Sequence, residues 1–125
     1  MRRLPIVIML IFVIFGCGKK LPDDKTLFEQ AQKYESEHEY AKASETYELL
    51  IDNYPSSPLR YKALFMAGFV QFEQMKDNKK AIELFDRLIK DYPDCDLADD
   101  AAAIKLAALS GKDLLSVLED SLRGK

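Results

Sequence analysis

Residues 43–63 read ASETYELLIDNYPSSPLRYKA and residues 81–101 read AIELFDRLIKDYPDCDLADDA, so one pattern returns after 38 positions. The residues that recur are Ala43, Tyr47, Leu50, Ile51, Tyr54, Pro55, Leu59 and Ala63, matched by Ala81, Phe85, Leu88, Ile89, Tyr92, Pro93, Leu97 and Ala101. Inside each copy the apolar residues recur at helical spacing. Such a repeat predicts stacked helical hairpins, because one hairpin cannot bury its apolar face alone. An array of this kind is typical of a binding surface rather than of a catalyst.

The remainder of the chain predicts further helices, and no segment shows the alternation of a strand. Asp23 and Asp24 suit the start of a first helix, where they complement exposed N–H groups. Tyr54-Pro55 ends the second helix, because proline disfavours helical geometry in the residue before it, and Gly111 suits a left-handed cap after the fifth. The expected helices span residues 26–37, 40–53, 58–75, 78–91, 96–109 and 112–122. They predict an all-α solenoid of about two and a half hairpins over residues 25–125.

The N-terminus has the features of an export signal. Arg2 and Arg3 precede an apolar run at residues 4–15, and Gly16-Cys17 follow it. A membrane-spanning helix needs about 20 apolar residues, and this run is shorter and contains Pro5. We therefore expect residues 1–16 to be a signal peptide and residues 17–24 to form a short linker.

The run Ile14-Phe15-Gly16-Cys17 resembles the lipobox of bacterial lipoproteins, although Phe15 is bulkier than the usual small residue. The resemblance implies that Cys17 is joined to diacylglycerol, with palmitate-like acyl chains, and becomes the new N-terminus. Several chains hold a protein on a membrane, whereas one binds only marginally. The alternative is an uncleaved anchor that ends at Cys17. By the same resemblance, Gly18 after the cysteine favours the periplasmic face of the outer membrane over the inner membrane.

The repeated pattern itself resembles the tetratricopeptide repeat. The positions that carry the resemblance are Ala31, Tyr34, Ala43, Tyr47, Leu50 and Pro55 in the first copy and Phe72, Ala81, Phe85, Leu88 and Pro93 in the second. Gly68 lies one residue early relative to the family's glycine, which leaves the register of the third helix open by one position. Leu50 and Leu88 replace the usual alanine, which implies a looser approach of the helices.

The period of 38, the Tyr-Pro-x-Ser/Cys junctions and the lipobox together resemble outer-membrane repeat lipoproteins. The nearest types are the BamD-like member of the β-barrel assembly machinery and the periplasmic repeat protein that works with the Tol-Pal system. The resemblance implies a role in envelope assembly. The same repeat serves unrelated functions, so it indicates the fold more strongly than the role.

Charge and motifs exclude several other functions. Without residues 1–16 the chain keeps 16 Lys and Arg against 21 Asp and Glu, a net charge of −5. It lacks the basic cluster that nucleic-acid binding requires. It also lacks a glycine-rich phosphate loop, a nucleophile elbow and a histidine-containing triad. We therefore expect no enzyme activity, no cofactor and no nucleic-acid partner.

Isolated polar residues have ordinary structural explanations. An acidic cluster precedes the fifth helix, at Asp94, Asp96, Asp99 and Asp100. Its spacing does not match a calcium loop, and we expect it to cap the helix and complement its dipole. His38 is the only histidine, so we expect a solvated turn residue and no metal site. Cys95 matches Ser57 between the copies, and a half-buried small residue is expected there.

The candidate binding residues lie on the third helix. Tyr61, Phe65 and Phe69 share one face, and Phe72 follows at helical spacing. Aromatic stripes usually pack against neighbouring helices, so burial in the core is the competing interpretation, above all for Phe72. We expect a membrane-anchored periplasmic scaffold whose groove, lined by the first helix of each hairpin, holds a protein or peptide. The alternative is a structural envelope lipoprotein that oligomerises without an exchangeable ligand.

Overall fold

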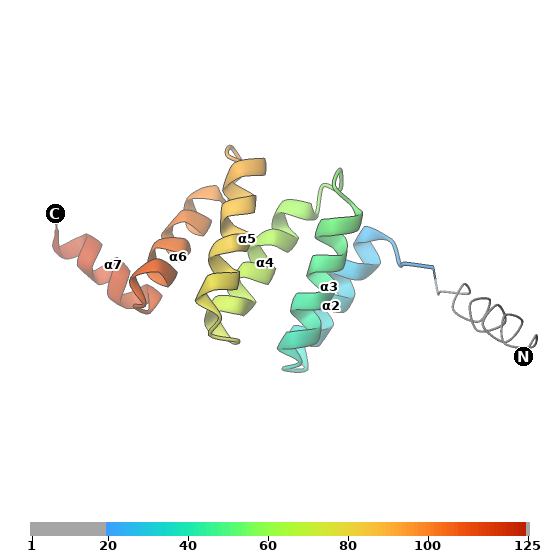
Figure 1. The fold of residues 1–125 in the computed structure, drawn as a ribbon, viewed down its shortest axis with the longest axis horizontal. Coiled ribbons are helices and arrows are strands. Elements are labelled where there is room, and N and C mark those ends of the chain that lie inside the picture. Colours follow the sequence, from blue (N-terminus) through green and yellow to red (C-terminus); the bar gives the residue numbers. More distant parts are fainter. Residues whose placement is uncertain (1–19, 125) are drawn as a thin grey trace, which may run out of the picture.

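The structure is a computed structural model of the 125-residue chain, and it describes residues 20–124. These residues form helices without strands: α2 (Asp24–Ser36), α3 (Tyr40–Asn53), α4 (Arg60–Glu73), α5 (Asn78–Asp91), α6 (Ala98–Ser110) and α7 (Leu114–Arg123). The predicted all-α hairpin solenoid is confirmed (Figure 1). The expected signal peptide at residues 1–16, the expected lipidation of Cys17 and the first part of the linker lie outside the described residues.

The helices stack side by side in chain order, and α2 and α7 lie at opposite ends of the stack (Figure 1). α2 pairs with α3 and α4 with α5, while α3 also packs on α4 and α5 on α6. The repeated positions fill the space between them, because Tyr47, Leu50, Phe85 and Leu88 are all fully buried. The apolar pattern that recurs after 38 residues is therefore the core of the solenoid.

Helix ends follow local hydrogen bonds. The Asp23 carboxylate accepts from the Thr26 N–H at 2.7 Å, as expected for the start of α2, and Gly111 adopts the left-handed cap with φ +68°. The expected capping of α6 by an acidic side chain is wrong, because Leu97 occupies the cap position without a side-chain bond. Asp99 and Asp100 lie in the first turn instead, where they complement the helix dipole.

The third helix is shorter than the expected 58–75. At its start the Ser57 hydroxyl accepts from the Leu59 N–H at 3.1 Å, so this segment forms a turn before the helix begins at Arg60. At its end the Gln74 and Met75 N–H groups both donate to the Val70 carbonyl at 3.0 Å. The regular hydrogen-bond ladder therefore stops at Glu73.

The structure fixes the register of this helix, which the sequence left open. Phe28 packs edge-on against Tyr47 with 5.6 Å between ring centroids, and Phe65 packs in the same way against Phe85 at 5.9 Å. Phe65 follows Phe28 by 37 residues, whereas Phe85 follows Tyr47 by 38. The α4–α5 turn of the second copy is therefore one residue longer than the α2–α3 turn of the first copy. Gly68 is thus the counterpart of Ala31.

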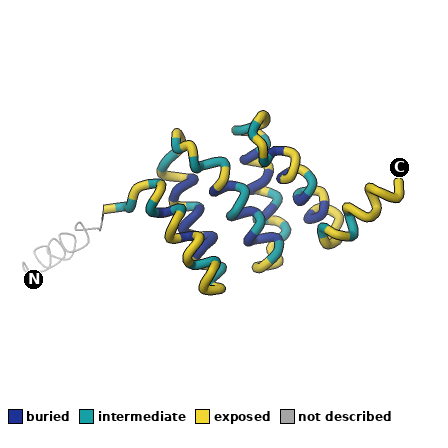
Figure 2. The backbone as a smooth tube through the Cα atoms, turned by 180° about the vertical axis from the view of Figure 1, so that it is seen from behind, coloured by how far each residue is buried: buried dark blue, intermediate teal, exposed yellow. Residues whose placement is uncertain are grey.

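α7 differs from the other helices. It contains no buried residue, and it projects away from the stack beyond α6 (Figure 1). Figure 2 shows burial concentrated in the central helices and exposure along most of α7. Among residues 20–124, no helix is long and apolar enough to cross a membrane.

Candidate functional site: a groove beside helix α4

The predicted aromatic stripe lies along one side of α4. The opposite side of this helix is built from small and aliphatic residues, Ala63, Leu64, Ala67 and Val70, which are fully buried. Tyr61, Phe65 and Phe69 are half-buried, so each ring divides its surface between the protein and solvent. Phe72 keeps only 6% of its surface exposed and belongs to the core. One side of α4 therefore carries both a core residue, Phe72, and three aromatic residues that reach the surface.

Phe65 and Phe69 form a stacked pair, with ring centroids 6.4 Å apart and 15° between planes. The core supports this pair from behind, because Phe65 also packs edge-on against the fully buried Phe85. Offset and edge-on arrangements are the favourable geometries for aromatic rings. The two rings are thus held in fixed positions and do not need to be ordered when a partner binds.

A cavity of about 230 Å³ opens next to Phe65. Its lining comes from α4, α6 and α7, namely Phe65, Asp100, Ala103, Ile104, Leu114 and Leu118. The side chains are mostly apolar, and Asp100 adds a carboxylate. The α6 residues had no clear signal in the sequence, because α6 is rich in alanine. Leu118 shares helical spacing with Leu115 and Leu122, but nothing in the sequence indicated that Leu114 and Leu118 would lie near α4.

Tyr61 is placed differently from the phenylalanine pair, although it shares their side of α4. Its ring packs against Tyr92 with centroids 5.9 Å apart. The neighbouring Arg60 bonds Asp91 at 2.9 Å and the Ile51 carbonyl at 3.0 Å. Burial alone would lower the pKa of Arg60, but its bonds to Tyr92 and Asp91 outweigh burial and raise it. Arg60 thus joins α4 to α3 and α5 and fixes the helix end that carries Tyr61.

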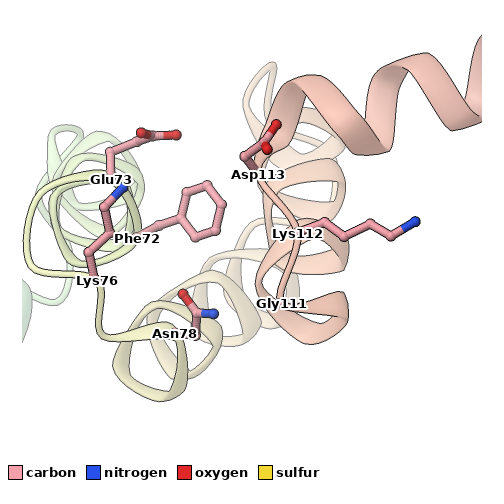
Figure 3. Close-up of a pocket in the computed structure, with 7 residues that line it drawn as sticks. All are labelled: Phe72, Glu73, Lys76, Asn78, Gly111, Lys112 and Asp113. Atoms are coloured by element: carbon pink, nitrogen blue, oxygen red, sulfur yellow. The ribbon is translucent and has the colours of Figure 1, made fainter.

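A second cavity, of about 210 Å³, lies where the α4–α5 turn meets the α6–α7 turn (Figure 3). The ring of Phe72 points into it, while Lys112 points away. The Lys112 ammonium instead bonds Asp120 at 2.5 Å, and the Asp113 carboxylate caps α7 through the Ser116 N–H at 2.8 Å. Lys112 and Asp113 are thus engaged within the chain, and the cavity lies at the junction between the second and third hairpins.

The other singled-out residues have structural roles. His38 sits in the α2–α3 turn with φ +60°, and its Nδ1 lies 2.8 Å from the Tyr40 hydroxyl. Cys95 is half-buried, and its N–H donates to the Tyr92 carbonyl as that of Ser57 does to Tyr54 in the first copy. No three His, Cys, Asp or Glu side chains group into a possible metal site in the part of the chain that the structure describes.

Comparison with known families agrees with this geometry. The family model described as tetratricopeptide repeat matches residues 25–57 and 62–94, which together make up more than half of the chain. The protein therefore belongs to the tetratricopeptide repeat family. The two matches begin 37 residues apart, which is the spacing found between Phe28 and Phe65. No curated protein matches this chain. Stacked repeats of this kind build extended surfaces that serve as protein–protein interaction scaffolds.

Proposed function

We propose that the protein is a membrane-anchored periplasmic scaffold that holds a protein or peptide in the groove beside α4. The observation that carries the proposal is Phe65, which packs on the core through Phe85, stacks on Phe69 and borders an apolar cavity. A few large apolar side chains in fixed positions usually supply most of the energy of an interface. Catalysis has no part in this role.

The cavity indicates the chemistry of the partner. Its volume of about 230 Å³ is below the roughly 300–1,000 Å³ typical of small-molecule sites. It suits one large apolar side chain of a protein partner. Asp100 in its lining favours a neighbouring lysine, arginine or N–H donor on that partner, because a carboxylate accepts charge-assisted hydrogen bonds. The partner segment would therefore present an apolar residue next to a basic one.

The proposed location rests on the signal-like N-terminus and on the start of the domain. The Tyr54 hydroxyl donates to the Pro22 carbonyl at 2.6 Å, and Leu21 packs against the core. The chain therefore joins the domain at Leu21. Four residue steps separate Leu21 from Cys17, and they span at most about 14 Å. A lipid on Cys17 would hold the groove close to the membrane surface, as a role in outer-membrane or envelope assembly requires.

One observation favours the structural alternative. Five leucines of α6 and α7 are exposed at the C-terminal end of the stack, and such a surface suits association between copies. In that reading the protein is an envelope component that oligomerises without an exchangeable ligand. The two surfaces share Leu118 but otherwise differ, because the groove also uses Phe65 and Ala103 whereas the leucine surface does not. Changes at Ala103 can therefore separate the two functions.

The test is a pull-down from solubilised membranes with the full chain and two tryptophan variants. Ala103→Trp fills the cavity without removing a core contact, and Glu83→Trp adds the same side chain to the exposed face of α5. A substoichiometric, salt-sensitive partner that the first variant loses and the second retains supports the scaffold. Recovery of this chain alone, as one stable homo-oligomer with no second protein in either variant or in the unsubstituted chain, contradicts it and supports the structural role.

A further inference from the structure

The C-terminal end of the stack presents two apolar surfaces. The first, the open α6 face, consists of Ala102, Leu106 and Leu109, and the two leucines are 57% and 60% exposed. The second, the α7 stripe, consists of Leu115, Leu118 and Leu122, with exposures of 72%, 45% and 74%. Both sets have helical spacing, so each lies along one side of its helix.

The open α6 face corresponds to a surface that is covered in the preceding hairpin. Leu106 follows Gly68 by 38 residues. On α4, Gly68 faces Phe85 of α5 so closely that a Cβ there would lie 2.8 Å from the ring. In the third hairpin the second helix is absent from this position, because α7 points away from the stack (Figure 1). α6 therefore lacks the close partner helix that α4 has, although Leu106 and Ser110 line a cavity with Val117, Asp120 and Ser121 of α7.

The complement of the open α6 face is present on the same chain. Ala102, Leu106 and Leu109 are spaced by four and then three residues, and Leu122, Leu118 and Leu115 repeat this spacing in the reverse direction. An antiparallel pairing places Leu106 opposite Leu118 and Leu109 opposite Leu115. Charges match in this register, because Arg123 at the end of one helix comes beside Asp99 at the start of the other.

The opposite end of the stack cannot take this role. The exposed side of α2 carries the charged residues Lys25, Glu29 and Lys33, and two i,i+4 ion pairs, Lys25–Glu29 and Lys33–Glu37, lie on it. It has no exposed large apolar residue among the described residues. A head-to-tail stack would bury charge against leucine, which is costly. Within residues 20–124, a second copy can therefore offer a matching apolar surface only through the same end.

We propose that the protein forms a two-fold dimer in which α7 of each copy pairs antiparallel with the open α6 face of the other. A second copy supplies both complementary surfaces at once, so the α6 and α7 leucines of the two chains are covered in one symmetric interface. The exchange of an identical terminal element is a low-cost route to a dimer. Gly111, in the left-handed conformation at the end of α6, lets the chain leave α6 in the direction that α7 takes.

The test uses the full chain in mild detergent, in a Cys95→Ser background, with one cysteine introduced into each variant. One chain carries Leu106→Cys, a second chain with a different tag carries Leu118→Cys, and the two are mixed under mild oxidation. The control pair replaces Leu106→Cys by Leu49→Cys, whose leucine is 43% exposed on α3 and distant from this end. The Cys95→Ser chain with no introduced cysteine shows how much intermolecular disulfide forms through Cys17 alone.

A mixed disulfide between the Leu106→Cys and Leu118→Cys chains, absent from the Leu49→Cys control, is the expected result. A chain that carries both cysteines and closes the disulfide within itself, as a monomer, would show that α7 folds back on its own α6 and would overturn the proposal. Sedimentation then checks the charge pair. Arg123→Glu should weaken the dimer about two- to fivefold, and adding Asp99→Arg should restore it. A chain that stays monomeric at all concentrations also refutes the dimer.

Discussion

Gly68→Ala is the substitution that most sharply tests the packing of α4 on α5. Alanine is the better helix former by about 1 kcal/mol, so the exchange should stabilise an exposed helix. At Gly68, however, the new Cβ would lie 2.8 Å from Cε1 and 2.9 Å from Cζ of Phe85. The ring of Phe85 is fully buried and cannot move aside cheaply. Overpacking of this kind costs about 1–3 kcal/mol, and after the gain in helix propensity we expect a net loss of up to about 2 kcal/mol.

The assay is denaturant unfolding followed by helical circular dichroism. At this domain size such a loss lowers the melting temperature by up to roughly 15 °C. Glu83→Gly and Glu83→Ala, on the exposed side of α5, measure the helix-propensity difference alone. Phe85→Leu should relieve the contact, so that Gly68→Ala becomes neutral or stabilising in that background. If Gly68→Ala instead stabilises the otherwise unchanged chain by about 1 kcal/mol, the two helices do not approach as described and the register of α4 is wrong.

Three further predictions concern the core, the half-buried carboxyl group of Glu35 and the anchor. Leu88→Ala should lower the unfolding free energy by about 2–4 kcal/mol, because Leu88 is fully buried. The control Lys90→Ala, on the same helix, should lower it by under about 0.5 kcal/mol. Equal losses of stability for the two variants in a thermal melt would contradict this prediction. Burial raises the pKa of Glu35 above its ordinary value of 4.5, against the opposing bond from Tyr47. The folded state thus holds this proton more tightly, and the stability that it contributes is lost as pH rises from 4.5 through the raised pKa. In the Glu35→Gln variant, the unfolding free energy should depend less steeply on pH over this range. A pH dependence equal to that of the unsubstituted chain would refute the raised pKa of Glu35. Cys17→Ala should abolish labelling by a clickable fatty acid, and labelling equal to that of the unsubstituted chain would exclude lipidation at this residue.

The repeated segments were the most predictable part of the fold. The expected helices 40–53 and 78–91 have the same bounds as α3 and α5, because a Tyr-Pro pair ends each one and the apolar spacing is unbroken. The ends of α4 were less predictable. The turn at Ser57 and the two N–H groups that share the Val70 carbonyl depend on side-chain and backbone bonds that helical periodicity does not encode.

The candidate site was predictable only in part. The position of Phe65 and Phe69 on one side of α4 follows from their spacing. How much of these rings is buried depends on the position of Phe85 and on the direction of α7. The spacing of Leu115, Leu118 and Leu122 fits a helix that closes the third hairpin as well as one that points away. The sequence therefore could not indicate that the cavity beside Phe65 would be bounded by α7.

Photo-crosslinking from within the groove tests the proposed binding role most directly. A benzoylphenylalanine at position 69 replaces a half-buried ring with a larger one, and the same group at position 83 on exposed α5 serves as the control. In living cells we expect the probe at position 69 to capture a protein other than this chain, and Ala103→Trp in the same molecule to abolish the capture. Equal capture from position 83, or capture that Ala103→Trp leaves unchanged, would show that the groove beside α4 is not the binding surface.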